Sequence, residues 1–231
     1  MRALALGLAA LFAASGCDIP RDPEGTLQRV RGGTIRVGVA EHDPWVVIDA
    51  TGEPTDGVEV DLVEEFAASI DADIEWIDDE TEELIAGLHT HSLDLVIAGL
   101  NSKSPFSKDA TFTHPYITTF TTIGIPLQTD VDVDLTGTEV AVEAGSELEG
   151  LVRKLDVVVE VVDDVTMVEG AVVIDNWLLD DLGLKASDVR ITETDHVMAV
   201  PHGENAWLTA LERFLLANGD RARELLEEDA P

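Results

Sequence analysis

The hydrophobic pattern alternates between short apolar runs and amphipathic segments over the first half of the chain. Short apolar or β-branched runs bounded by turn residues predict strands, at 34–39, 73–77 and 93–98. Helices are predicted between them, at about 61–70 and at 82–88; in the first, Leu62, Phe66 and Ile70 share one face. Strands that alternate with helices in this way predict an α/β lobe with a parallel sheet.

The same pattern restarts after 117–126, a threonine-rich segment that indicates a crossover into a second lobe. Strands are expected at 139–142, 157–162 and 171–174, and helices at 147–154 and about 176–182. The chain then passes 189–192 and returns through 196–201 to a final helix that packs on the first lobe. Its apolar face holds Trp207, Leu208, Leu211, Phe214 and Leu215.

The N-terminus has the order of an export signal. One arginine precedes an apolar stretch from Ala3 to Ala14, and the small residues Ser15 and Gly16 lead to Cys17. This end resembles a bacterial lipobox, which implies cleavage after residue 16 and a lipid on Cys17. We therefore expect a signal peptide at 1–16 and a tether at 17–33, which lacks apolar periodicity. A chance thiol in a discarded leader is the alternative. Cys17 is the only cysteine, so no intrachain disulfide forms.

Charge narrows the choice of partners. The chain has 47 acidic and 14 basic residues and a net charge of −33, which excludes nucleic acid as a partner because phosphate binding needs a basic footprint. Acidic residues spread along the chain favour solubility at high salt, where self-repulsion is screened. A salt-loving source is our hypothesis, and an ordinary acidic exported protein is its rival.

Several stretches carry a family resemblance. They are 34–39, Pro44-Trp45, 57–62, 93–100 and 112–116. In these stretches the chain resembles the solute-binding proteins of amino-acid-type ABC importers, the bacterial extracellular solute-binding proteins of family 3. The resemblance implies a periplasmic-binding-protein-like α/β fold of type II, with two lobes joined by two crossover strands. Lobe 1 would comprise 34–122 and 196–231, and lobe 2 would comprise 123–195. The family usually has a helix and a short turn before the strand at 171–174, whereas 163–170 leaves room here for about two helical turns, so lobe 2 is expected to be abbreviated.

The resemblance also implies binding residues in the first lobe. Trp45 matches the family's pocket aromatic residue, and Gly99 and Asn101 match polar contacts after the third strand. Phe106 stands where the family has an arginine that grips the ligand's carboxylate with a bidentate fork, and lysines such as Lys103 lack that fork. We therefore expect a ligand that is not recognised as an α-amino acid. Trp45 and Phe106, facing each other in an acidic surround, would suit a cationic or neutral amine-containing solute; local packing of both rings is the alternative.

In the second lobe the resemblance points to a turn and an aspartate. Gly145 and Ser146 match a turn whose N–H groups bind an oxygen of the ligand, and Asp175 matches an aspartate that binds an ammonium group. Ser146 with Glu149 also fits a helical capping box, and Asp175 also fits an N-cap.

Catalytic and metal motifs are sparse. Neither a Gly-x-Ser-x-Gly elbow nor a Walker loop nor HExxH occurs. His89 and His91 lack a third ligand nearby in sequence, so surface positions are favoured over a zinc site. We expect a monomeric, lipid-anchored binding protein on the outer face of the cytoplasmic membrane or in the periplasm, without enzymatic activity or cofactor, that serves an ABC permease. A sensor or accessory lipoprotein on the same fold is the alternative.

Overall fold

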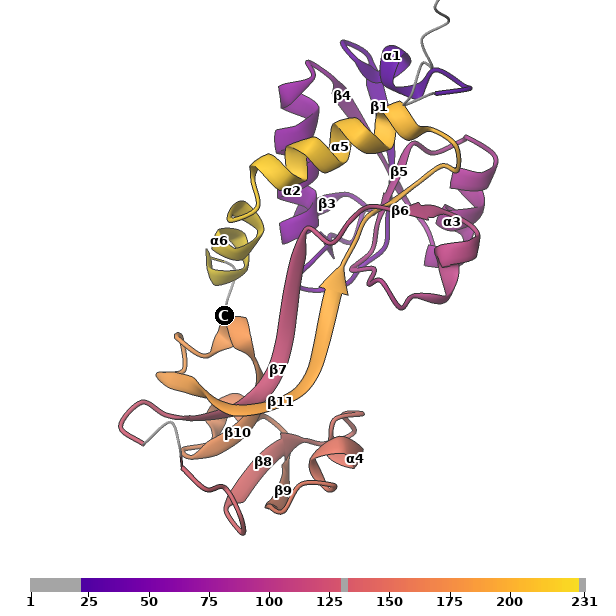
Figure 1. The fold of residues 1–231 in the computed structure, drawn as a ribbon. Helices are drawn as coiled ribbons and strands as arrows, with labels where there is room; N and C mark the ends of the chain where they lie inside the picture. The colour runs from indigo at the N-terminus through magenta and orange to yellow at the C-terminus, as the bar shows by residue number, and fades with distance from the viewer. Residues whose placement is uncertain (1–21, 130–132, 229–231) are drawn as a thin grey trace, which may run out of the picture.

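Two five-stranded sheets form the two lobes of the molecule (Figure 1). The computed structural model describes residues 22–129 and 133–228. In lobe 1 the strand order is β4-β1-β5-β12-β6. The strands are β1 (Thr34–Val39), β4 (Asp73–Asp78), β5 (Leu95–Ile97), β6 (Thr111–Phe112) and β12 (Ala199–Val200). β1 pairs in parallel with β4 and β5, as the alternating pattern predicts, whereas β12 is antiparallel to β5 and β6.

Helices cover both faces of the lobe 1 sheet, and β5 shows why. Leu95 and Ile97 join a core formed with α1, α2, α5 and α6, whereas Val96 joins a second core formed with α3. Successive side chains of a strand point to opposite faces, so a continuous apolar run fits a sheet buried on both sides. The helices are α1 (Thr26–Val30), α2 (Val58–Ser69), α3 (Thr81–His89), α5 (Asn205–Ala217) and α6 (Arg221–Glu228).

Two long antiparallel strands join the lobes. β7 (Ile117–Pro126) and β11 (Leu184–His196) run as a ribbon from lobe 1 into the sheet of lobe 2, whose order is β11-β7-β10-β8-β9 (Figure 1). The rest of lobe 2 is β8 (Glu139–Glu143), α4 (Glu149–Val152), β9 (Val158–Val162) and β10 (Ala171–Asp175). The smaller elements of the molecule are β2 (Val47–Ile48), β3 (Pro54–Asp56) and the 3₁₀ turns η1 (Pro105–Lys108), η2 (Val165–Met167) and η3 (Asn176–Leu178).

The predicted strands and the long helices of lobe 1 are confirmed, with end shifts of a few residues. Lobe 2 differs more. The helix expected at 147–154 shrinks to the four residues of α4, and the helix expected at about 176–182 is wrong: the chain forms the 3₁₀ turn η3 followed by turns. Asn176 explains part of this, because its Oδ1 accepts from Phe120 N at 2.7 Å and anchors the segment to β7. The short helix α6 was not predicted.

The predicted tether at 17–33 is also wrong for the part that the structure describes. Residues 26–30 form α1, whose Val30 is fully buried in the core of lobe 1. Glu204, just before α5, accepts from Glu24 N at 3.0 Å and Thr26 N at 3.1 Å. These partners lie about 180 residues away along the chain, so local periodicity gave no sign of them. Cys17 and the expected signal peptide lie outside the described residues.

None of the helices described here has both the length and the apolar character that crossing a membrane requires.

Candidate functional site

Trp45 lies in the core of lobe 1 and is only 3% exposed. His196, the last residue of β11, stacks on it with ring centroids 3.7 Å apart. Trp177 of η3 meets it edge-on at 6.1 Å, and Tyr116 does so at 6.2 Å. The expected pocket aromatic is therefore enclosed by protein side chains, one of which comes from lobe 2.

Gly99 follows β5, and its N–H donates to Glu59 Oε2 at 2.9 Å. It adopts a left-handed φ of 59°, and a Cβ at this position would lie 2.6 Å from the imidazole of His42, so the turn requires glycine. Because Glu59 already accepts the N–H, the polar contact expected from Gly99 is directed into the protein and not towards a solute.

Asn101 links the same loop to the crossover ribbon. It forms a backbone bridge with His196, and its Oδ1 accepts from Lys103 N at 3.0 Å. Lys103 Nζ in turn donates to the carbonyl of Glu193 on β11 at 3.2 Å. The loop after β5 is thus held against the ribbon, and the half-buried Asn101 stays at the carboxyl edge of the sheet, where open α/β sheets bind ligands.

Phe106 does not face Trp45. It lies in η1 and packs against the core around α3, where it borders a surface hollow with Ile85, Ala86 and His89. Trp45 belongs to the other core of lobe 1. The expected pair of facing aromatic walls does not form, because the two rings lie on opposite sides of the sheet.

The structure does bring two of the lobe 2 residues together. Ser146 and Asp175 line one hollow of about 110 Å³, with Thr121 and Glu143 also in its wall. Glu143 ends β8 and Asp175 ends the parallel strand β10, so the hollow lies at the carboxyl edge of this sheet. Asp175 Oδ1 accepts from Thr121 Oγ1 at 2.6 Å, and within the described residues its second oxygen has no donor. Burial raises the pKa of Asp175, and the bond from Thr121 offsets part of this effect.

The sequence also allowed a capping box at Ser146 and an N-cap at Asp175, and only the N-cap position is observed. Ser146 Oγ accepts from Leu148 N at 3.2 Å, but the carboxylate of Glu149 pairs with Arg153, so the capping box is not formed. Asp175 holds the N-cap position of η3 without a side-chain cap bond. The exposed Gly145 adopts a left-handed φ of 78°, the turn conformation that glycine allows.

Thr119 and Thr121 of β7 connect the two carboxyl edges. Thr119 Oγ1 lies 2.9 Å from His196 Nε2, and Thr121 binds Asp175. Side chains two residues apart on a strand share one face. The hollow of lobe 2 and the Trp45–His196 stack therefore lie on the same face of the ribbon.

Arg190 of β11 lies on the other face. Its guanidinium carbon is 4.0 Å from the ring centroid of Phe120, the strand neighbour of Thr121, and it pairs with Glu193 at 3.1 Å. Arg190 therefore does not take the place of the carboxylate-binding arginine that the family resemblance implies at the position of Phe106.

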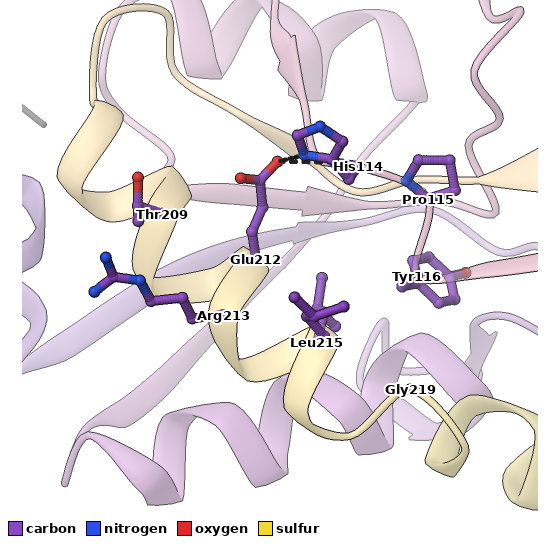
Figure 2. A pocket seen from close by; sticks show the side chains of 9 residues that line it. His114, Pro115, Tyr116, Thr209, Glu212, Arg213, Leu215 and Gly219 are labelled. Atoms are coloured by element: carbon purple, nitrogen blue, oxygen red, sulfur yellow. Dashed lines mark hydrogen bonds and ion pairs between the residues drawn. The ribbon is translucent and has the colours of Figure 1, made fainter.

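Lobe 1 has two further surface hollows. Acidic side chains from the ends of β1 and β4 border a hollow of about 520 Å³ on lobe 1; they are Glu41, Asp78, Asp79 and Glu80. An apolar hollow of about 460 Å³ lies between Pro115–Tyr116 and α5, with the His114–Glu212 pair at 2.7 Å beside it (Figure 2).

Within 22–129 and 133–228, no three His, Cys, Asp or Glu residues are grouped to hold a metal ion.

Four residues of this region were not predicted from the sequence: Glu59, Thr121, Glu143 and His196. A signal existed for two of them. Glu59 is an acidic residue flanked by Val58 and Val60 at the start of a helix, and Glu143 ends a strand as Asp175 does. Thr121 and His196 gave no local sign, because their partners come from other elements.

Two α/β lobes on a two-stranded ribbon, with polar groups at both carboxyl edges, define a two-lobed binding protein. Residues 35–220 match the model of the bacterial extracellular solute-binding proteins, family 3, and the chain belongs to this family. No curated protein matches it in sequence.

Solved structures share the fold. The L-cystine solute receptor of Neisseria gonorrhoeae, unliganded and open, has a TM-score of 0.69 at 16% identity, with 88% of this chain and 96% of that one covered. An ancestral cationic amino acid solute-binding protein reaches 0.63 at 19% identity, covering 89% and 97%. An ancestral cyclohexadienyl dehydratase also reaches 0.63 at 19% identity, covering 84% and 93%.

Proposed function

We propose that this solute-binding protein holds a small amine-containing solute, cationic or neutral, between its two lobes and presents it to an ABC permease. The observation that carries the proposal is the carboxylate of Asp175. It is half-buried beside a hollow, it meets one hydroxyl, and its second oxygen has no donor among the residues described. An ammonium group satisfies such an oxygen with a charge-assisted hydrogen bond.

Other groups fit the same class of solute. Ser146 and Glu143 line the hollow with Asp175, and Asn101 supplies an amide at the carboxyl edge of lobe 1. The net charge of −33 favours the approach of a cation over that of an anion. The structural neighbours include a cationic amino acid solute-binding protein and an L-cystine receptor, and an amine-bearing ligand is in keeping with both.

Closure over the solute follows from the two-lobed plan. A ligand that touches both lobes favours the closed state, because only there are all its contacts made. In this proposal the closed form is the one presented to the permease, and a lipid on Cys17 would hold the protein at the membrane. No enzymatic step is part of the proposal.

Thermal unfolding of residues 18–231 in high salt tests the proposal against amino acids, polyamines, betaines and small peptides. A solute at about a hundred times its dissociation constant adds about 2.7 kcal/mol of stability. We expect stabilisation by amine-containing solutes. Asp175→Asn should weaken the best of them by about 10- to 100-fold, the loss expected for a hydrogen bond to a charged group.

Asp180→Asn is the matched control, since it removes the same charge from an exposed position of lobe 2. It should leave the affinity unchanged. If no member of the panel stabilises a folded sample, or if Asp175→Asn binds as tightly as the wild type, the proposal is wrong.

A further inference from the structure

Glu59 is a fully buried carboxylate in the first turn of α2, with 0% of its surface exposed. Its Oε2 accepts from Gly99 N and its Oε1 accepts from Tyr116 OH, both at 2.9 Å. No lysine, arginine or histidine pairs with it in the part of the chain described here, although Asp94 in the same lobe has two arginines. A buried acid without a cation is costly, so its two bonds call for a functional explanation.

These bonds tie together the parts of lobe 1 that lead to the proposed binding site. Gly99 begins the loop that carries Asn101, and Tyr116 directly precedes the crossover strand β7. The imidazole of His42 closes the other side of Gly99, so the loop has little freedom at this point. A change at Glu59 therefore reaches both the loop and the strand on which the lobes are joined.

The protonation state of Glu59 decides which hydrogen bonds it forms with Gly99 and Tyr116. An ionised carboxylate accepts from both donors with charge-assisted bonds, which is the arrangement observed. A protonated carboxyl still accepts from Gly99 with its carbonyl oxygen, but more weakly. Its hydroxyl then donates to the oxygen of Tyr116, whose own proton must turn to another partner. The loop is held firmly in the first state and loosely in the second.

The groups around Glu59 leave it free to titrate. Burial raises the pKa of Glu59 to about 7, with the bonds from Gly99 and Tyr116 acting in the opposite direction. The pKa of Tyr116 is raised well above its ordinary value by burial and by Glu59, so the phenol keeps its proton. On β11, burial and His42 lower the pKa of His196 to about 4, which leaves that imidazole neutral near pH 7. His42, in the loop after β1, is a further ionisable side chain of this region and lies against Gly99.

We propose that Glu59 is a positioning residue for solute binding, whose ionised form fixes the Gly99–Asn101 loop against β7, so that the protein releases its solute as the surroundings are acidified. The inference has two parts: the ionised form of Glu59 fixes the loop, and the affinity for the solute therefore falls in acid. Only the second part, the affinity part, rests on the proposed function. The control of the loop by Glu59 is a property of the solute-free protein.

The experiment follows the amide of Gly99 by NMR through a pH titration of the solute-free protein. In the wild type this resonance should move with a midpoint near neutrality. Glu59→Gln should abolish that movement, because the glutamine carbonyl accepts from Gly99 and its amide donates to Tyr116 at every pH. Glu64→Gln, which removes an exposed charge from the same helix, should titrate as the wild type does.

Binding of the panel solutes, measured by calorimetry near pH 8 and near pH 6, supplies the second readout. We expect wild-type affinity to fall by up to about tenfold at the lower pH. Glu59→Gln should bind with the weaker affinity at both pH values. Tyr116→Phe provides a second variant should Glu59→Gln fold poorly; its loss of one donor should move the Gly99 midpoint upwards.

A Gly99 resonance that is insensitive to pH, or that still titrates in Glu59→Gln, overturns the inference. So does a solute whose affinity is equal at the two pH values, and in that case the proposed function stands. If no panel solute binds, the proposed function and the affinity part fail together, while the Gly99 titration still decides whether Glu59 controls the loop.

Discussion

Asp94 and Glu59 show, at the scale of single residues, how partners decide the state of a buried carboxylate. Both are almost completely covered, and burial alone raises the pKa of each. Around Asp94, hydrogen bonds from the side chain and backbone of Arg36 and from Arg29 outweigh burial and lower the pKa. Glu59 has only neutral donors, and its pKa rises. The first acid is thus fixed in its ionised form, and the second titrates.

Asp94→Asn should lower the free energy of unfolding at neutral pH by about 2–4 kcal/mol, because two arginines lose a buried partner while their exposed parts stay hydrated. Chemical denaturation measures the loss. Because the pKa of Asp94 is lowered in the folded protein, its contribution to stability depends on pH. The stabilisation is present above the unfolded pKa of about 4 and disappears as the pH falls through the folded value. The gap between wild type and variant should therefore narrow in acid.

Asp73→Asn is the control, since it removes an exposed carboxylate from a neighbouring strand of the same sheet. We expect a change below about 0.5 kcal/mol, as for surface substitutions in general. An Asp94→Asn protein as stable as this control would show that the two arginine pairs contribute nothing.

At the scale of elements, Asp22 caps a helix that begins more than 180 residues later. Its Oδ1 accepts from Ala206 N at 2.8 Å and Trp207 N at 2.9 Å, two of the first N–H groups of α5, which lack partners within the helix. Its Oδ2 accepts from Leu27 N at 2.8 Å and joins α1 to the same point. A carboxylate here also interacts favourably with the helix dipole.

Asp22→Ala should therefore cost about 0.5–2 kcal/mol of unfolding free energy, the usual effect of a lost cap. Asp22→Asn keeps an acceptor and should recover part of the loss, whereas the exposed Glu24→Ala should have little effect. Denaturation midpoints of the three variants test this order. Equal stability of Asp22→Ala and Glu24→Ala would contradict a capping role.

These long-range bonds also mark the limit of what the sequence predicts. Strands and helices with a clear period, such as β1 and α5, follow from local pattern because their apolar faces need burial wherever they lie. The segment at 22–33 and the turn η3 depend on Glu204 and Phe120, which are distant in sequence. Among site residues, Ser146 and Asp175 end up together because parallel strands share a carboxyl edge. Trp45 and Phe106 do not, because residue type alone fails to specify which side of a sheet a ring occupies.

The whole molecule carries a charge that the fold must tolerate. With 47 acidic and 14 basic residues, and several of the arginines committed to ion pairs such as Asp94–Arg36 and Glu149–Arg153, most carboxylates face solvent beside others of the same sign. Self-repulsion opposes the compact state, and salt screens it over a Debye length of about 10 Å at 0.1 M and about 3 Å at 1 M.

Stability should therefore rise with sodium chloride between about 0.1 M and about 1 M and then level off, because screening saturates once the Debye length falls below the spacing of neighbouring charges. The thermal unfolding midpoint of residues 18–231 measures this rise, with sucrose at matched osmolality as the uncharged control. Exclusion of solutes from the surface would make salt and sucrose act alike and would continue above 1 M. A midpoint that is independent of salt below about 1 M would contradict the salt-adaptation hypothesis and favour an ordinary acidic exported protein.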